Sequence, residues 1–204
     1  MLQVKSLFID TSSSFVNIYI LKDNSILVSK SHHTLKDMAN SIMPLIRESF
    51  NEVDFDIKDI DKIFVTVGPG SFTGVRVGIT VAKTISWSLS IPVYPISTLE
   101  YLASIDTNYN KIISIIDARR GNVFAGFYDL NLNKLDAEKL VGYDELSKGD
   151  DTLVVSYDGV YNSTISNINI LKTVNKHLDD KSINPHKLVP NYLKKTEAEE
   201  KLND

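Results

Sequence analysis

The sequence predicts an α/β fold with two lobes, and three observations support this prediction. An apolar run at residues 2–9 stops at Asp10 and is followed by turn-forming residues. Strand-like and helix-like segments then follow in the order strand, strand, strand, helix, strand, helix, strand. Later in the chain, the sequence IID that ends at Asp117 echoes the sequence FID that ends at Asp10, which indicates a duplicated lobe. The alternative is a fortuitous echo, because strands that end at an aspartate are common in α/β chains.

The first part of the chain predicts a meander of three antiparallel strands. Besides residues 2–9, the strand-like segments are residues 15–21 and residues 25–29. The last two are joined at Asp23 and Asn24, which tolerate a positive φ in a tight turn. We therefore expect the second and third strands to form a hairpin.

A helix is expected from Thr34, where apolar residues recur at helical spacing. Pro44 removes one internal hydrogen bond and should kink this helix. The apolar positions are Leu35, Met38, Ile42, Leu45, Ile46 and Phe50.

Strands and helices then alternate. A continuous apolar strand at residues 62–67 precedes a long helix from Ser71 to about Ser90. A strand at residues 91–96 and a short helix at residues 97–104 follow. Because these strands need crossover helices, they should be parallel. Three meandering strands followed by crossover-connected strands match the ribonuclease H-like core.

The remaining sequence predicts a smaller second lobe. A strand at residues 123–128 follows Asp117 at nearly the spacing seen after Asp10. Its other periodic segments are short and are interrupted by Asn and Asp. We therefore place one ribonuclease H-like lobe in residues 1–106 and a smaller, incomplete lobe in residues 107–204.

Composition restricts the possible functions. Of 204 residues, 43% are apolar, enough for one substantial core or two small ones. A net charge of -4 disfavours autonomous binding of nucleic acid, because no excess of basic side chains is available for phosphates. The absence of cysteine excludes disulfides and thiolate chemistry and is typical of a reducing compartment. No apolar run of about 18 residues and no signal peptide are present, so we expect a cytoplasmic chain without a membrane segment.

Glycines surround the start of the long helix, in the sequence GPGSFTG at residues 68–74. A Walker loop needs Lys and then Ser or Thr after its last glycine, but Gly74 is followed by Val75 and Arg76. A dinucleotide fingerprint needs two residues between its second and third glycines, whereas three separate Gly70 from Gly74. The spacing therefore excludes both nucleotide motifs, and we expect the glycines to permit a sharp turn from strand to helix.

Small residues form a ridge along the long helix. They recur every fourth residue, at Gly74, Gly78, Ala82, Ser86 and Ser90, and let another backbone approach closely. With the flanking aliphatic residues they cover an arc of about 220°, whereas one sheet face needs about 100°. The excess predicts a further neighbour for this helix. Either another chain covers it, with the first helix joining the contact, or the second lobe of the same chain does.

The sequence offers no catalytic constellation. No two histidines stand four residues apart, which excludes a helical pair of metal ligands, and no G-x-S-x-G elbow is present. The four histidines are expected to be exposed; they are His32, His33, His177 and His186. We therefore predict no catalytic residue and no metal ligand in this chain.

Two strand-end aspartates are the candidates for a ligand site. Asp10 and Asp117 could face one cleft between the lobes and, with Thr11 and Ser12, hold a hydrated cation under a nucleotide. In the alternative, each aspartate caps the turn that follows its strand. The arginine pair shortly after Asp117 could form a salt bridge with it or contact a phosphate.

Four segments, in order along almost the whole chain, carry a family resemblance. The sequence GPGSFTGVRVGITVAK at residues 68–83, followed by IPVYPISTLEYLA, is similar nearly position for position to the signature of the TsaB family, also called YeaZ. FIDTSSS resembles the family's IDTS strand end, and IDARRGNVFAG its DARRGEVY segment. PNYLK at residues 190–194 resembles its P-x-Y-L-R, although Lys194 lacks the forked geometry of arginine.

The resemblance implies the fold of the actin-like ATPase superfamily, with a reduced second lobe. It also implies a role beside TsaD, the paralogue with paired metal-binding histidines, and the ATPase TsaE. Together they transfer threonylcarbamoyl from its adenylate to the tRNA adenosine beside the anticodon. The transfer chemistry belongs to TsaD, so this chain would be a non-catalytic dimerisation scaffold or activator that meets tRNA only through the complex. It would need no cofactor, although weak binding of ATP or ADP with Mg in the interlobe cleft stays open.

The resemblance places the contact with TsaD, or with a second copy when TsaD is absent, on the first helix and the glycine-rich helix. The residues expected at this interface are Met38, Ile42, Gly74, Arg76, Gly78, Val81, Ala82 and Ile85. Two rival functions stay open. One is an ATPase or small-molecule kinase that uses the cleft at Asp10 and Asp117, and the other is a protease that acts on TsaD.

Overall fold

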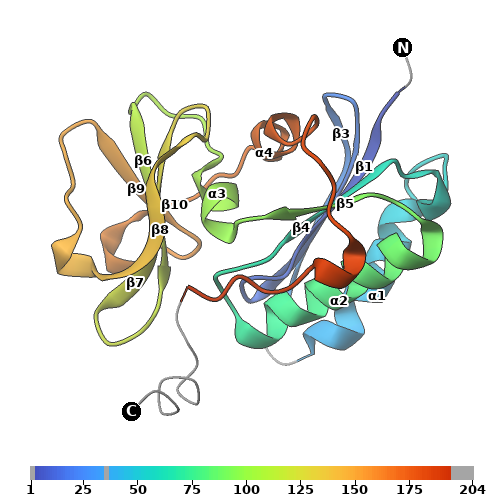
Figure 1. The fold of residues 1–204 in the computed structure, drawn as a ribbon, viewed down its shortest axis with the longest axis horizontal. Helices are drawn as coiled ribbons and strands as arrows, with labels where there is room; N and C mark the ends of the chain where they lie inside the picture. Colours follow the sequence, from blue (N-terminus) through green and yellow to red (C-terminus); the bar gives the residue numbers. More distant parts are fainter. Residues whose placement is uncertain (1–2, 35–36, 194–204) are drawn as a thin grey trace.

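Two lobes lie side by side, each built on a five-stranded sheet (Figure 1). The computed structural model describes residues 3–34 and 37–193. The sheets are formed by residues before and after the short helix α3 (Thr98–Ala103), respectively. This arrangement confirms the predicted two-lobed α/β class.

The first sheet has the strand order β3-β2-β1-β4-β5. Strand β1 pairs antiparallel with β2 and parallel with β4, and β5 is parallel to β4. The strands are β1 (Lys5–Asp10), β2 (Phe15–Lys22), β3 (Ser25–His33), β4 (Lys62–Thr66) and β5 (Val93–Ile96). The predicted meander and the parallel crossovers are therefore confirmed, and Asp23 has the positive φ expected of the hairpin turn.

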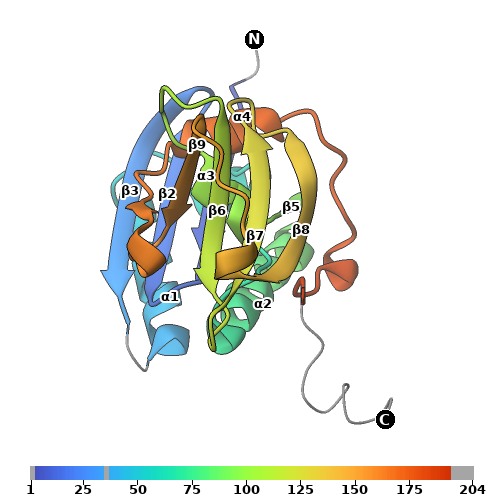
Figure 2. The same cartoon turned by 90° about the vertical axis from the view of Figure 1, so that its left-hand side faces the viewer.

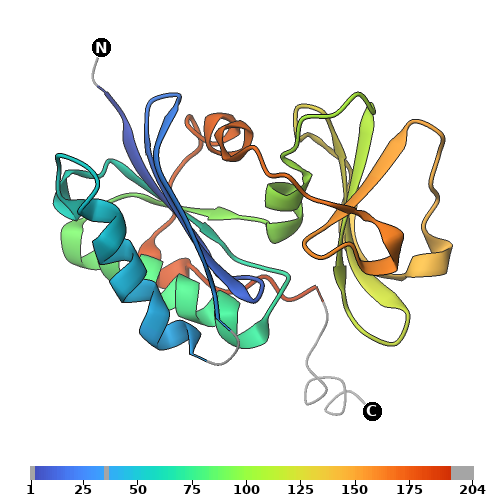
Figure 3. The ribbon, with the colours of Figure 1, turned by 180° about the vertical axis from the view of Figure 1, so that it is seen from behind.

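Helices α1 (Met38–Phe50) and α2 (Phe72–Leu89) cover one face of this sheet (Figure 3). The Ser71 hydroxyl accepts a hydrogen bond from the Gly74 amide and caps the start of α2. Ser90 ends it in the left-handed conformation, with φ 57°. Aliphatic residues of β1, β2 and β4 form a core against both helices. The predicted start of the first helix at Thr34 was early, and Leu35 lies outside the described residues.

The second sheet repeats the order of the first. Its order is β10-β9-β6-β7-β8, so β6 to β10 take the places of β1 to β5. Figure 2 shows β9, β6, β7 and β8 of this sheet side by side. The strands are β6 (Lys111–Asp117), β7 (Asn122–Asp129), β8 (Lys134–Gly142), β9 (Thr152–Ser156) and β10 (Thr164–Ile165). Three-residue 3-10 turns, η2 (Tyr143–Glu145) and η3 (Val160–Asn162), stand where α1 and α2 stand in the first lobe. The second lobe is thus a reduced copy.

The joint between the lobes is helical. All six residues of α3 are buried, and the helix packs against the second sheet while Tyr101 also reaches the core of the first. Helix α4 (Ile170–Lys176) covers the other face of the first sheet.

The chain has returned to the first lobe at α4, and the segment after α4 runs along α2. Ile183 forms an isolated bridge to Val93, and the Asn191 amide donates to the Val67 carbonyl. The remaining short helices are η1 (Ile57–Asp59) and η4 (Pro185–Lys187). The boundary at residue 106 stays a prediction, but the return of this segment means that the first lobe also uses residues from the predicted second one. None of the described helices combines the length and apolar character that a membrane crossing requires.

Candidate functional site: the interlobe cleft and the α1–α2 groove

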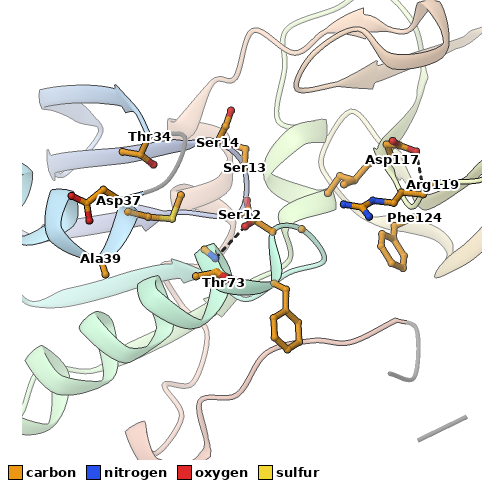
Figure 4. Close-up of a pocket in the computed structure, with 16 residues that line it drawn as sticks. Ser12, Ser13, Ser14, Thr34, Asp37, Ala39, Thr73, Asp117, Arg119 and Phe124 are labelled. Atoms are coloured by element: carbon orange, nitrogen blue, oxygen red, sulfur yellow. Dashed lines mark hydrogen bonds between the residues drawn. The ribbon is translucent and has the colours of Figure 1, made fainter. Parts of the chain in front are cut away.

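A cleft of about 790 Å³ separates the two lobes at the ends of β1 and β6 (Figure 4). The turn after β1 contributes the hydroxyls of Ser12, Ser13 and Ser14. From the second lobe, Asp117 and Arg119 line it. The first turns of α1 and α2 complete its wall. The cleft is therefore polar on both sides, as expected where two equivalent strand ends meet.

Asp10 lies behind this wall rather than in it. Its side chain is fully buried and accepts hydrogen bonds from the Ser12 amide (3.0 Å), the Ser12 hydroxyl (2.5 Å), Asn17 Nδ2 (2.9 Å) and Thr66 Oγ1 (2.7 Å). The Tyr157 hydroxyl lies 3.2 Å from the second carboxylate oxygen. Because both oxygens already accept hydrogen bonds within the protein, the geometry matches the turn-capping alternative for Asp10.

Asp117 makes the same local turn in a different setting. Its Oδ1 accepts from the Arg119 amide at 2.8 Å, as Asp10 Oδ1 accepts from the Ser12 amide. However, Asp117 is exposed and lines the cleft. No salt bridge joins it to either following arginine within the described ranges. The structure brings only the second of the two aspartates into the cleft.

Thr11 fixes the start of α2 to the end of β1. Its hydroxyl donates to the Gly74 carbonyl at 2.8 Å. A Cβ atom at Gly74 would lie 2.0 Å from the Thr11 carbonyl oxygen, and one at Gly78 would lie 2.2 Å from Thr11 Oγ1. Thr11 is itself fully buried, so it contributes packing rather than a ligand atom.

This contact corrects the expected role of the small-residue ridge. Gly74, Gly78, Ala82 and Ile85 are buried against their own lobe, so the backbone that approaches closely is that of β1 and its turn. The repeat of small residues indicated close approach correctly. It did not indicate which backbone approaches, and a partner cannot reach Gly74 and Gly78 without displacing Thr11 at the strand end.

A groove of about 410 Å³ lies between α1 and α2 on their outer side. It is lined by Ala39, Phe72, Thr73, Arg76, Val77, Thr80 and Val81. The Phe72 side chain is 54% exposed, and Met43 of α1 is 50% exposed. Of the expected interface residues, the structure thus brings Arg76 and Val81 to this surface, leaves Met38 partly buried and buries Ile42 in the core.

Arg76 is held in place at one edge of the groove. Its guanidinium carbon lies 3.6 Å from the centroid of the Phe72 ring, and its Nε donates to the Tyr192 hydroxyl at 2.8 Å. Sequence reasoning missed Phe72 and Tyr192 as neighbours of Arg76, although Tyr192 stands in the PNYLK segment. Lys194, the last residue of that segment, lies outside the described residues.

His177 is a second correction, because it is not an exposed surface histidine. Its Nε2 contacts the Glu100 carboxylate, and its Nδ1 lies 2.5 Å from Asp180 Oδ2. Burial lowers the pKa of His177, but the hydrogen bonds to Glu100 and Asp180 outweigh burial and raise the pKa above 6.5. Burial raises the pKa of the Glu100 carboxyl, but the hydrogen bonds and charges of His177 and Lys176 outweigh burial and bring that pKa below 4.5.

The other three histidines are exposed as expected. His32 and His33 lie on β3, and the His186 ring packs edge-to-face against Trp87. In residues 3–34 and 37–193, no group of three or more histidine, aspartate or glutamate side chains is placed to hold a metal. The absence of catalytic and metal-binding residues stays a prediction.

Comparisons with known proteins agree with this architecture. A family model described as "TsaD: tRNA N6-adenosine threonylcarbamoyltransferase" matches residues 30–153. The chain is 32% identical to the tRNA threonylcarbamoyladenosine biosynthesis protein TsaB of Bacillus subtilis, over 96% of both chains. It is also 38% identical to a tRNA N6-adenosine threonylcarbamoyltransferase of Persephonella marina, over 32% of this chain and 19% of the relative.

Solved structures support the same assignment of the fold. YeaZ from Pseudomonas aeruginosa superposes with a TM-score of 0.80 at 21% sequence identity, covering 93% of this chain and all of the other. Whereas the transferase relative matches along a short stretch, the Bacillus relative matches from end to end. The chain therefore belongs to the TsaB (YeaZ) family, within the wider domain family that the TsaD model describes.

Proposed function

We propose that this protein acts in tRNA threonylcarbamoyladenosine biosynthesis as the non-catalytic partner of a TsaD-type transferase, which it binds through the α1–α2 groove. One observation carries the proposal. On the outer side of the two helices, an apolar groove that includes the half-exposed Phe72 is left uncovered by the described residues, and α1 also exposes half of Met43. Apolar patches of this kind mark binding surfaces in soluble proteins.

The relationship between the chain and the transferase supports pairing through like elements. Both match the same domain family, so the transferase is expected to carry helices equivalent to α1 and α2. Two such helix pairs can pack as a four-helix bundle. In the absence of the transferase, a second copy of this chain would take its place, giving a homodimer.

The chemistry of the groove agrees with a structural rather than a catalytic role. Its lining is aliphatic and aromatic except for two threonines and Arg76, and no acidic side chain lines it. Here the transfer of threonylcarbamoyl belongs to the transferase, and TsaE supplies the ATPase activity. The chain would act in the cytoplasm, touch tRNA only through the complex, and stabilise the productive shape of its partner.

Val81→Glu tests the proposal. Val81 is partly buried at the groove, so a carboxylate there would be buried without a partner at the interface. We expect the affinity for the cognate transferase, measured by sedimentation velocity, to fall by about tenfold or more, and tRNA modification in the reconstituted system to fall with it. Ile165→Glu is the matched control, since Ile165 is 63% exposed on β10. Unchanged assembly of the Val81 variant beside a folded control would overturn the proposal.

The rival functions make different predictions in the same mixture. A nucleotide-binding enzyme is favoured by Arg119 and by Thr34, whose buried hydroxyl borders the cleft without a hydrogen-bond partner in the described structure. Micromolar binding of ATP with Mg by the isolated chain, with turnover, would support that rival. A protease would shorten the transferase on a denaturing gel, whereas we expect it to stay intact.

A further inference from the structure

One residue of the second lobe completes a hydrogen-bonded cluster of the first. Tyr157 directly follows β9, and its ring packs against the core that β1 and β4 share with α4. Its hydroxyl lies 2.8 Å from Ser12 Oγ and 3.2 Å from Asp10 Oδ2. Within the described ranges, these are the only side-chain hydrogen bonds that join residues 5–96 to residues 111–165.

The protons in the cluster can be assigned from the available donors. Asp10 accepts from the Ser12 hydroxyl at 2.5 Å and from the Ser12 amide, so the hydroxyl proton of Ser12 is already committed. The phenol proton of Tyr157 then points to Ser12 Oγ or to Asp10 Oδ2, and Tyr157 is the donor in both arrangements. Burial and the nearby Asp10 charge raise the pKa of Tyr157 well above 10, which keeps this proton in place.

The other side-chain hydrogen bonds between the lobes lie at the helices α3 and α4, where Lys176 Nζ of α4 also donates to the Leu132 carbonyl of the second lobe. Ser166 Oγ donates to the Leu102 carbonyl, and Lys172 Nζ to the Ile105 carbonyl, so both contacts hold the end of α3. If the lobes were connected at the helical joint alone, they could rotate about it as about a hinge. A second contact, away from the joint, would prevent this rotation. Tyr157 supplies that second contact on the cleft side, next to Ser12 in the cleft wall.

We propose that Tyr157 fixes the orientation of the second lobe on the first, because its hydroxyl completes the hydrogen-bonded cluster at Asp10. The contact with Tyr157 also gives Asp10 a role different from that of a ligand residue. Its carboxylate anchors the opposite lobe. This inference does not depend on the docking of a transferase.

Tyr157→Phe removes the hydroxyl and keeps the ring. The chain has no cysteine, so spin labels can be placed at Ser29→Cys on β3 and Ala137→Cys on β8, both of which are exposed. With the doubly labelled chain diluted into excess unlabelled chain, we expect one narrow interlobe distance distribution for the parent and a distinctly broader one for Tyr157→Phe. Amide exchange at residues 10–14 should accelerate by roughly tenfold, because buried groups lose a donor.

Tyr143→Phe is the control. Its hydroxyl donates to the Tyr161 carbonyl at 2.7 Å within the second lobe, so the variant loses a tyrosine hydrogen bond without touching the cluster. It should keep the narrow distribution and the parent exchange rates at residues 10–14. The proposal is overturned if Tyr157→Phe also keeps both, or if Tyr143→Phe broadens the distribution equally.

Discussion

The two lobes have the same strand order but differ in what covers their sheets. In the first lobe, the crossovers are the helices α1 and α2, which bury one sheet face and leave a groove on their outer side. In the second lobe, the corresponding connections are the short turns η2 and η3. The strand order is therefore retained without long crossover helices. The groove therefore exists only where the crossovers of the described chain are long helices.

The strand-end aspartates show the same contrast at the level of single residues. Both accept a hydrogen bond from the amide two residues later. Asp10 is then enclosed by Asn17, Thr66 and Tyr157, whereas Asp117 faces the cleft. The local turn is the same in both lobes, and its surroundings determine whether the carboxylate is a buried anchor or an exposed group.

The largest difference in stability between variants of the two lobes should come from replacing a glycine with alanine. In Gly74→Ala the new Cβ would lie 2.0 Å from the Thr11 carbonyl oxygen, so β1 or α2 must move. We expect a loss of about 3 kcal/mol or more in the free energy of unfolding, or an insoluble chain. Gly149→Ala in the second lobe meets its nearest atom at 3.6 Å and should change stability by less than about 0.5 kcal/mol. Urea titration of both variants measures the difference, and equal midpoints would refute the packing described for Thr11.

The next effect separates the two aspartates. Asp10→Asn replaces an oxygen acceptor with an amide donor inside a buried cluster of donors, so we expect a loss of about 2–4 kcal/mol in stability. Asp117→Asn keeps an acceptor for the Arg119 amide at an exposed position and should cost about 0.5 kcal/mol or less. Comparable losses in thermal and urea unfolding would show that the buried and exposed settings do not differ as described.

The smallest effect concerns the joint between the lobes and depends on pH. The raised pKa of His177 means that its pairs with Glu100 and Asp180 stabilise the fold fully below pH 6.5. This contribution is lost as the pH rises through the raised pKa of the folded state. His177→Gln should therefore lower the urea midpoint at pH 6, by the equivalent of about 1 kcal/mol, and converge with the parent at alkaline pH. Parallel curves from pH 6 to pH 9 would contradict this assignment.

Much of the first lobe could be predicted because its signals are local. Strands such as β4 are continuous apolar runs, and the start of α2 is set by a turn and by the Ser71 cap. The residues of β8 are mostly exposed and mix charged with apolar side chains, so they lack the alternation that identifies a strand with one buried face. The five strands of the second sheet were therefore only partly visible in the sequence.

The missed features of the site depend on contacts between distant residues. Tyr157 is separated from Asp10 by 147 positions, and Tyr192 from Arg76 by 116. Nothing in the local pattern around either tyrosine indicates its partner. The ridge of small residues is an intermediate case, because its spacing predicts close approach but carries no information on the identity of the neighbour.

Amide hydrogen exchange on the chain with and without its cognate transferase tests the central claim most directly. If the α1–α2 groove is the docking surface, formation of the complex should slow amide exchange in α1 (residues 38–50) and in residues 72–84 of α2. Exchange in β8 (residues 134–142) should be unchanged. Slower exchange confined to the second sheet, with α1 and α2 unaffected, would contradict the assignment of this groove as the contact.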